Sequence, residues 1–357
     1  MAKQSELYKS VVVSTRIRLA RNFADYPFPN RLKNVSAARE IVKLVAAGLS
    51  HTEMLDLYYM NAISDEKAEF LKERNLISQD LINHRPISAA LVSRDESISV
   101  MINEEDHIRE QYFMRGFDLR AVYERVVGID DIISECIPFA YDESLGYLTA
   151  CPTNLGTGLR ASAMLFLPAL TRRNLMRRIT PELTRKGLVV RGAFGEGSGT
   201  EGELYQISNE VTLGISEDEI LDVVEQMVKT IVEFEQRERA RMLAEEEIAL
   251  TDRILRAYGI LTSCMRIDLK EFMLRMSDVK LGVALGILGG DYASLDDLIV
   301  DMRPANINRL NGAPLAAAEQ DIYRAEYVGK ALRGMDLLTT KERNALQLRS
   351  EHYTGGN

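Results

Sequence analysis

Cysteine and histidine are scarce in this chain of 357 residues, which contains three and four of them, respectively. The cysteines are Cys136, Cys151 and Cys264, and no two of them show Cys-x-x-Cys spacing. A disulfide framework needs regularly spaced cysteine pairs, and a structural zinc site needs about four closely spaced Cys or His ligands. We therefore expect neither a disulfide scaffold nor a resident metal site.

Motifs of the common phosphate-binding folds are also missing. The step Gly329-Lys330 is followed by alanine, so no Gly-x-x-x-x-Gly-Lys-[Ser/Thr] loop occurs, and the His-Arg-Asp and Asp-Phe-Gly kinase motifs are absent. Residues 197–202 match Gly-x-Gly-x-x-Gly, but Leu204–Ser208 reads as a strand rather than a helix that could hold a pyrophosphate. If the chain handles ATP, arginines must bind the phosphates.

Long apolar runs do not occur either. The longest, around Val279 to Leu288, is short and interrupted by glycine, and residues 1–10 lack the apolar core of a signal peptide. We expect no secretion, no membrane span and a cytoplasmic location. The formal net charge of −9 argues against general nucleic-acid binding, which needs a basic face.

What the sequence does contain is the balance of a folded protein, with 46% hydrophobic and 27% charged residues. The length suits one large domain followed by a smaller one. Strands are predicted at residues 11–21, 55–60, 97–102, 147–150, 188–192 and 204–208, and helices at 37–49, 65–72 and from about Ala161 into Pro168–Arg178.

The second half of the chain reads as helical. A capping box, Ser216-Glu217-Asp218-Glu219, opens a long helix, and from about Ile248 onward the pattern stays helical to the end. Within the long helix, Glu233/Arg237 and Glu235/Arg239 are each four residues apart. That spacing predicts a solvated face with helical ion pairs.

Two arginines on one strand are the first candidate for chemistry. In Ser14-Thr15-Arg16-Ile17-Arg18, the period of two places Arg16 and Arg18 on one face and Ile17 on the other. An edge strand with a solvated basic face and a phosphate site are both consistent with that pattern.

Two loops add further candidates. Asn103-Glu104-Glu105-Asp106-His107-Ile108-Arg109 follows a strand and carries three adjacent acids, which on composition alone suggest a solvated turn. Cys151-Pro152-Thr153-Asn154-Leu155-Gly156-Thr157-Gly158-Leu159-Arg160-Ala161-Ser162 combines a thiol, a proline-fixed corner, two glycines and an arginine. The glycines either let the backbone approach a ligand closely or serve only the geometry of a turn.

These segments, in this order, resemble signatures of the phosphagen (guanidino) kinases, over roughly Val11 to Leu213. The resemblance implies an α+β fold in which an antiparallel β-sheet is flanked by helices, with a catalytic domain at residues 1–243 and an all-helical domain at 244–357. It also implies a site for the phosphates of ATP. Five side chains would form it: Arg16, Arg18, Arg109, Arg160 and Arg191. Three backbone segments would assist them: Ser14, Thr15, Arg16, Ile17 and Arg18; Arg160, Ala161, Ser162, Ala163 and Met164; and Arg191, Gly192, Ala193, Phe194, Gly195 and Glu196.

The same resemblance implies that Glu105 and Glu196 clamp the acceptor guanidinium and that the thiolate of Cys151 lies against it. A protonated guanidinium is a poor nucleophile, so a carboxylate must orient it and accept a proton during attack on the γ-phosphorus. Arginines suit the donor side, because each carries a permanent charge and can fork two donors onto phosphate oxygens.

Within that family the chain most resembles the bacterial protein-arginine kinases, through the pattern Arg-Gly-x-x-Gly-Glu-Gly-Ser at residues 191–198 and the thirteen residues that precede Ser14. The resemblance implies phosphorylation of protein arginines with ATP and Mg²⁺, marking proteins for a Clp-type protease. The implied partners are a stress-response repressor, a small zinc-binding activator and a second copy of the chain. A kinase for a small guanidine such as free arginine, and a non-catalytic phosphoarginine-binding adaptor, remain alternatives.

The chain departs from the family pattern in two places. The phosphoarginine-sensing motif Arg-Asp-x-x-Arg-Ala reads here as Gln320-Asp321-Ile322-Tyr323-Arg324-Ala325, so one charge-assisted phosphate contact is missing. A histidine expected near the nucleotide is Asn75.

Overall fold

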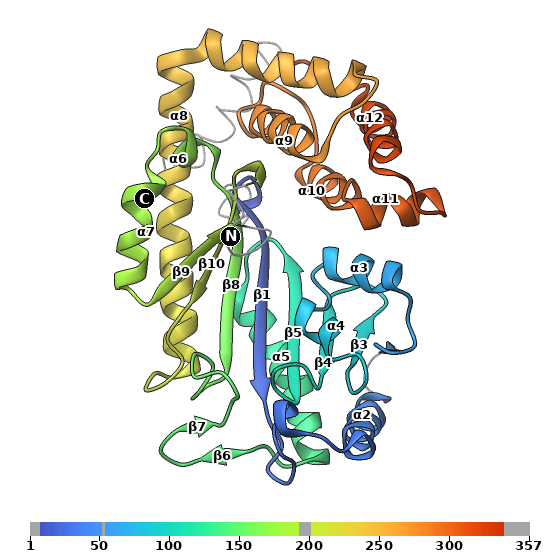
Figure 1. Ribbon diagram of the computed structural model, residues 1–357. Coiled ribbons are helices and arrows are strands. Elements are labelled where there is room, and N and C mark those ends of the chain that lie inside the picture. The colour runs from blue at the N-terminus through green and yellow to red at the C-terminus, as the bar shows by residue number, and fades with distance from the viewer. Residues whose placement is uncertain (1–7, 52–53, 193–200, 339–357) are drawn as a thin grey trace.

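A computed structural model describes residues 8–51, 54–192 and 201–338 (Figure 1). In this part of the chain, eight strands form one antiparallel sheet in the order β2-β3-β4-β5-β1-β8-β10-β9. The strands are β1 (Val12–Arg21), β2 (Leu55–Tyr59), β3 (Ala89–Ser93), β4 (Ile98–Ile102), β5 (Ile108–Arg115), β8 (Leu159–Phe166), β9 (Leu188–Gly192) and β10 (Leu204–Asn209); β6 (Tyr141–Asp142) and β7 (Gly146–Tyr147) pair separately.

Helices flank the sheet and then form a separate layer. Those of the first part are α2 (Val35–Leu49), α3 (Asp65–Glu73), α4 (Gln79–Asn83), α5 (Leu119–Cys136), α6 (Pro168–Arg172) and α7 (Met176–Arg185). The long α8 (Glu217–Ser263) leads to α9 (Leu269–Ala284), α10 (Tyr292–Asp301), α11 (Pro304–Asn311) and α12 (Ala317–Leu332), which we call the C-terminal helices. The expected α+β fold with an antiparallel sheet is thus confirmed.

The two faces of the sheet are covered differently. On one face, Leu19, Ala161 and Ile207 pack with apolar residues of α5 and α8 in one buried cluster. On the other face, α3 and α4 cover only the end formed by β3 and β4, through a smaller cluster that includes Met101. The middle of this second face, which we call the open face, is therefore left for polar side chains.

The helix predicted from about Ala161 is wrong, because Leu159–Phe166 is strand β8 in the middle of the sheet. Alanine, leucine and methionine favour helices, but Ala161, Ala163 and Leu165 alternate with Arg160 and its neighbours, which is the period of a strand. The helical segment begins only at Pro168. The predicted strand at 147–150 is likewise shorter, since β7 ends at Tyr147.

Helix α8 joins the two parts of the molecule. The predicted capping box is present: Ser216 Oγ accepts from the Glu219 backbone N–H at 3.3 Å, and Glu219 Oε2 accepts from the Ser216 N–H at 2.9 Å. The helix runs along the sheet and then bends into the layer of C-terminal helices (Figure 1). Its backbone leaves helical geometry once, at Glu246. Within the described ranges, no helix is both long and apolar enough to cross a bilayer.

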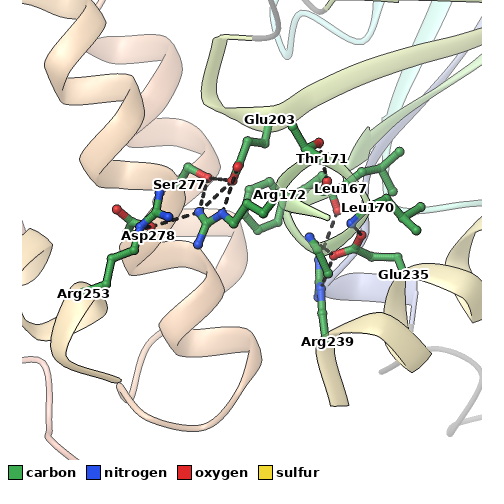
Figure 2. Close-up of polar contacts among 12 residues, drawn as sticks. Leu167, Leu170, Thr171, Arg172, Glu203, Glu235, Arg239, Arg253, Ser277 and Asp278 are labelled. Carbon is green, nitrogen blue, oxygen red and sulfur yellow. Dashed lines mark hydrogen bonds and ion pairs between the residues drawn. The ribbon is translucent and has the colours of Figure 1, made fainter. Parts of the chain in front are cut away.

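The prediction that both Glu/Arg pairs of α8 are solvated is wrong for one of them. Glu233 and Arg237 are exposed, but the side chains of Glu235 and Arg239 are 0% and 2% exposed and lie 2.6 Å apart (Figure 2). Glu235 accepts the backbone N–H groups of Ala169 and Leu170 in the first turn of α6, both at 3.0 Å. Because α6 packs on this side of α8, the pair is enclosed rather than solvated.

A second polar cluster joins the sheet to the C-terminal helices (Figure 2). Arg172 of α6 donates to both carboxylate oxygens of Glu203, at 2.8 and 2.7 Å, and forms an ion pair with Asp278 of α9 at 2.9 Å. Arg253 of α8 approaches the same Asp278 oxygen at 2.8 Å. Since Glu203 directly precedes β10, these contacts hold the start of that strand against α9.

Candidate active site

The strand register brings four predicted arginines onto the open face. Arg18 of β1 lies opposite Arg160 of β8, and Arg109 of β5 lies opposite Ala20, two residues further along β1. Arg16 shares their face because side chains alternate along a strand. Residues from three strands, separated by up to 144 positions in the sequence, therefore form one cationic cluster.

The cluster contains more positive charge than its immediate partners balance. Arg109 donates to both oxygens of Glu104, at 2.8 and 2.9 Å, and the Ser78 hydroxyl binds the same carboxylate. Arg16 donates to Gln206 at 3.2 Å, and Arg18 Nε is buried without a hydrogen-bond partner among the residues that the structure describes. A buried donor without a partner is costly, so the cluster is prepared for an anion.

The pKa shifts of the arginines also indicate a site for an anion. Burial, followed by the charges of Arg109 and Arg160, lowers the pKa of Arg16 to about 10. Burial and three neighbouring arginines lower the pKa of Arg18 well below its usual value, and Glu104 only partly opposes this. Each guanidinium would be stabilised by an anionic ligand, which phosphate oxygens supply with matching geometry.

Arg191 lies two strands beyond Arg160, in β9, where it is exposed and opposite Gln206 of the intervening β10. Burial lowers the pKa of Arg160, and the charge of Arg191 is the next largest cause, so the two guanidinium groups lie near each other. The fifth predicted arginine thus belongs to the same cluster.

The acidic loop after β4 adjoins the cluster. Glu105 is exposed, and its pKa is raised by partial desolvation and by the charges of Asp106 and Glu104. Asp106 is buried and accepts hydrogen bonds from Asn22 Nδ2 and from the Ala150 N–H, both at 2.6 Å. The loop is therefore fixed to the end of β1 and to the residue before Cys151, rather than being a solvated turn.

Asn22 is a contributor that the sequence analysis missed. Its side chain also accepts from the His107 N–H at 2.9 Å and donates to the Leu148 carbonyl at 3.1 Å, so one residue joins both motif loops. The only available signal was its position directly after the arginine strand.

Cys151 lies at the start of the second loop, where its Sγ is 3.0 Å from the hydroxyl of Thr153. A thiolate at this position would raise the pKa of Arg160, so the sulfur lies within electrostatic reach of the cluster. The loop thus brings the thiol of Cys151, which can act as a nucleophile or as an anion, to the side of the arginine cluster on which Glu105 lies.

The two glycines of this loop have a geometric role. Both have positive φ, +107° at Gly156 and +63° at Gly158. A Cβ at Gly156 would lie 2.3 Å from the carbonyl oxygen of Thr212, and one at Gly158 would lie 2.6 Å from that of Ala20. The glycines let the loop pack against its own protein, so close approach to a ligand is not needed to explain them.

A cavity of about 540 Å³ adjoins the cluster. Arg16 belongs to the cluster and also lines the cavity. The other walls come from the open face, the segment around Asn75 and helix α10. This volume is within the range of roughly 300–1,000 Å³ that is typical of small-molecule sites. The site can therefore hold an anion on the arginines together with a larger attached group.

Some predicted residues lie elsewhere. Ala193, Phe194, Gly195 and Glu196 fall outside the described residues. Gln320, Asp321, Arg324 and Ala325 lie on α12, where Arg324 is buried and donates to the carbonyls of Met302 and Ile267, at 2.9 and 2.8 Å, and to Asp321 at 2.8 Å. Gln320 donates to Asn308 at 3.0 Å.

Comparison with protein families gives two adjacent matches. The family model of the ATP:guanido phosphotransferase C-terminal catalytic domain matches residues 37–238, and that of the protein-arginine kinase McsB C-terminal domain matches residues 246–345. The first match begins after β1, so Arg16 and Arg18 are placed in the cluster by the structure alone.

Relatives cover nearly the whole chain. It is 42% identical over 328 residues to the protein-arginine kinase of Caldanaerobacter subterraneus subsp. tengcongensis, covering 91% of this chain and 97% of the relative. It is 40% identical over 333 residues to that of Clostridium novyi, covering 92% and 97%.

Among solved structures, a lombricine kinase superposes with a TM-score of 0.58 at 26% identity, covering 65% of this chain and 68% of that one. The substrate-free duplicated taurocyamine kinase from Schistosoma mansoni, at 24% identity, superposes with a TM-score of 0.57 over 73% of this chain and 40% of that one, and shows the same fold.

Proposed function

Because the chain belongs to the protein-arginine kinase family, we propose that it transfers the γ-phosphoryl group of ATP to the guanidinium groups of arginine residues in proteins. The observation that carries this proposal is the cationic cluster on the open face, which lies beside an exposed carboxylate, Glu105. The cluster suits a triphosphate, and the carboxylate suits a guanidinium.

On the donor side, Arg16, Arg18, Arg109, Arg160 and Arg191 bind the phosphates of ATP, together with the backbone of the three segments named above. Their charges stabilise the phosphoryl group as it leaves the β-phosphate and ADP departs. Within the described part of the chain Arg18 Nε has no partner, which supports this assignment because a phosphate oxygen would satisfy it. Arg109 is held in place by Glu104.

We propose that Mg²⁺ arrives bound to ATP. The described residues contain no group of three or more His, Cys, Asp or Glu side chains that could hold a metal ion by themselves. Magnesium usually keeps several waters and binds through substrate phosphates plus one or two carboxylates. When bound, it neutralises part of the phosphate charge, and Glu104 is the buried carboxylate nearest the arginines that could support it.

On the acceptor side, Glu105 orients the substrate guanidinium and accepts the proton that its nitrogen loses as the N–P bond forms. The raised pKa of Glu105 supports this role, since a more basic carboxylate is a better proton acceptor. We assign a second clamping carboxylate to Glu196 and a thiolate beside the guanidinium to Cys151. Asp106 and Asn22 keep Glu105 and Cys151 near each other.

The remaining assignments rest on family membership. We propose a catalytic domain at residues 1–243 and a helical domain at 244–357, a boundary that the helix break at Glu246 supports. The helical domain would pair two copies of the chain, and the segment from Gln320 to Ala325 would sense phosphoarginine. We further propose that the protein acts in the cytoplasm, together with a stress-response repressor, a zinc-binding activator and a Clp-type protease.

The test is incubation of the purified chain with Mg²⁺-ATP and either an unfolded arginine-rich protein or free arginine, followed by measurement of acid-labile phosphate. We expect label on protein arginine only. Label on free arginine alone would indicate a small-molecule kinase, and label on neither would favour an adaptor.

The matched variants for this assay are Glu105→Gln and Glu143→Gln. Loss of the proton acceptor should lower the rate of transfer by about 10²–10⁴-fold while the dissociation constant for ATP changes less than twofold. Glu143 is exposed on the turn between β6 and β7, so its variant should behave as the wild type. Full activity of Glu105→Gln would disprove the assigned role.

A further inference from the structure

We infer that helix α10 forms a wall of the nucleotide pocket, so that the C-terminal helices take part directly in binding the nucleoside of ATP. This inference rests on the proposed function, because it requires that ATP bind to the arginine cluster. It extends the nucleotide site to a part of the chain that follows the matched phosphotransferase domain.

The cavity lies between the sheet and α10. Its floor is the open face of the sheet, its sides include the segment at residues 74–76 and the turn at 95–96, and its roof is α10. The lining residues from α10 and its N-cap are Asp291, Tyr292, Ala293, Asp296, Asp297, Ile299 and Val300. More than a quarter of the residues that surround the cavity therefore come from α10 and its N-cap.

The arginine cluster also restricts the direction in which a bound nucleotide can extend. A triphosphate held by the arginines must direct its nucleoside away from them, and Arg16 links the cluster to this cavity. The walls suit a purine ring, because Phe113 and Met164 of the sheet face the same cavity as Val300 of α10. Small-molecule sites combine apolar walls of this kind with a few polar groups that fix orientation.

Helix α10 and its N-cap also contribute polar residues to the lining of the cavity. Asp291 and Asp297 line the cavity, and both are exposed to solvent. Asp291 also accepts hydrogen bonds from Ser294, and Asp297 pairs with Arg115, but a carboxylate can accept several hydrogen bonds at once. Carboxylates accept hydrogen bonds from ribose hydroxyl or exocyclic amino groups, and a bare phosphate chain has neither group. The roof therefore complements the nucleoside and would contribute little to binding of the phosphates.

One of the contacts between the roof and the sheet is a polar contact at the end of β5. Arg115, at the end of β5, forms an ion pair with Asp297 and donates to the Ala293 carbonyl at 3.1 Å. Both charged side chains are 52% exposed, and ion pairs with this exposure contribute about 0–1 kcal/mol. A nucleoside in contact with both walls would add substantially to this attachment.

The experiment compares ATP with inorganic tripolyphosphate, both with Mg²⁺, as ligands of wild type and of Val300→Trp. The indole would fill part of the cavity, so we expect ATP to bind at least tenfold more weakly while tripolyphosphate binding changes less than twofold. Leu310→Trp, at a 45% exposed position on α11 outside the cavity, is the matched control and should bind both ligands as the wild type does.

Hydrogen exchange of the wild type provides a second measurement that needs no substitution. ATP should slow amide exchange in α10, and tripolyphosphate should not. Unchanged ATP binding by Val300→Trp, or unchanged exchange in α10 when ATP is bound, would overturn the inference. Failure of the wild type to bind ATP at all would instead contradict the proposed function, so the two failures can be told apart.

Discussion

Arg18 shows what a cluster of like charges costs a protein that has no ligand bound. Its guanidinium lies among Arg16, Arg109 and Arg160, its Nε is buried with no partner in residues 8–51, 54–192 and 201–338, and its pKa is well below the usual value. Burying a charge without compensation is unfavourable, and functional sites commonly retain such groups at the expense of stability. The same residue should therefore have opposite effects on stability and on ATP binding.

The substitution Arg18→Met tests this opposition. Methionine keeps an unbranched apolar side chain but removes the repelled charge, so the unliganded protein should unfold at a higher temperature. ATP should bind at least tenfold more weakly, because a charge-assisted hydrogen bond contributes about 1.5–3 kcal/mol. Thermal unfolding with and without ATP measures both effects.

Arg39→Met, on the exposed surface of α2, is the control and should change neither quantity. A lower unfolding temperature for unliganded Arg18→Met would show that the arginine stabilises the fold by itself. The cluster would then be structural at this position.

At the scale of elements, the buried ion pair between Glu235 and Arg239 stabilises the contact between α8 and α6. Arg239 also donates to the Phe166 carbonyl at 3.0 Å, and Glu235 satisfies two N–H groups of α6. Removing one partner of such a pair leaves an uncompensated buried charge, which costs about 3–5 kcal/mol. We expect Arg239→Met to lower the free energy of unfolding by about this amount, as measured in urea.

Arg237 gives a matched control two residues away on the same helix. It is exposed, and a surface substitution of this kind changes the free energy of unfolding by about 0.5 kcal/mol or less. If Arg239→Met and Arg237→Met had equal effects, the enclosed pair would contribute no more to stability than a surface charge.

Elements whose pattern is local could be predicted from the sequence. The alternation of Arg16 and Arg18 fixes β1, and the capping box fixes the start of α8. Strand β8 was missed because Ala161, Ala163 and Leu165 are good helix formers, and its identity depends on strands far away in the sequence. The motif loops were located correctly, although the role of Gly158 depends on the position of β1.

Features that depend on packing between elements could not be predicted. The pairs Glu233/Arg237 and Glu235/Arg239 have the same spacing, and only the position of α6 decides which is buried. The position of α10 beside the cavity could not be predicted either, because no spacing in the sequence relates Val300 to Arg16.

At the scale of the whole molecule, stability should depend on pH through His107. This side chain is fully buried, its Nδ1 accepts from the Phe23 N–H at 3.2 Å, and its Nε2 lies 3.1 Å from the Pro27 carbonyl. Burial lowers its pKa to about 4, below the value near 6.5 of an unfolded histidine. The unfolded chain therefore binds the extra proton between these values, and stability is lost as the pH falls from about 6.5 to about 4.

The effect can be isolated by comparing wild type with His107→Gln, whose amide can keep both hydrogen bonds without titrating. The wild type should lose on the order of 3 kcal/mol more than the variant over this pH range. Burial raises the pKa of Asp106, which has the opposite influence on stability as the pH falls, so only the difference between the two proteins is informative. Parallel pH profiles would show that His107 is not the group responsible.

The central position of β1 has a consequence for how the chain is made. This strand precedes the other seven of the sheet in sequence, yet its neighbours are β5 and β8, and β8 begins about 140 residues after β1 ends. At a synthesis rate of roughly 5–20 residues per second, β1 leaves the ribosome about 7–28 s before its second partner is complete. During that interval its edge is open to other chains, and Arg18 has no Arg160 opposite it. The nascent polypeptide can therefore pair β1 with β5, and so add Arg109 to the cluster, before Arg160 has been made. A chaperone that covers the other edge of β1 would protect it until β8 is complete.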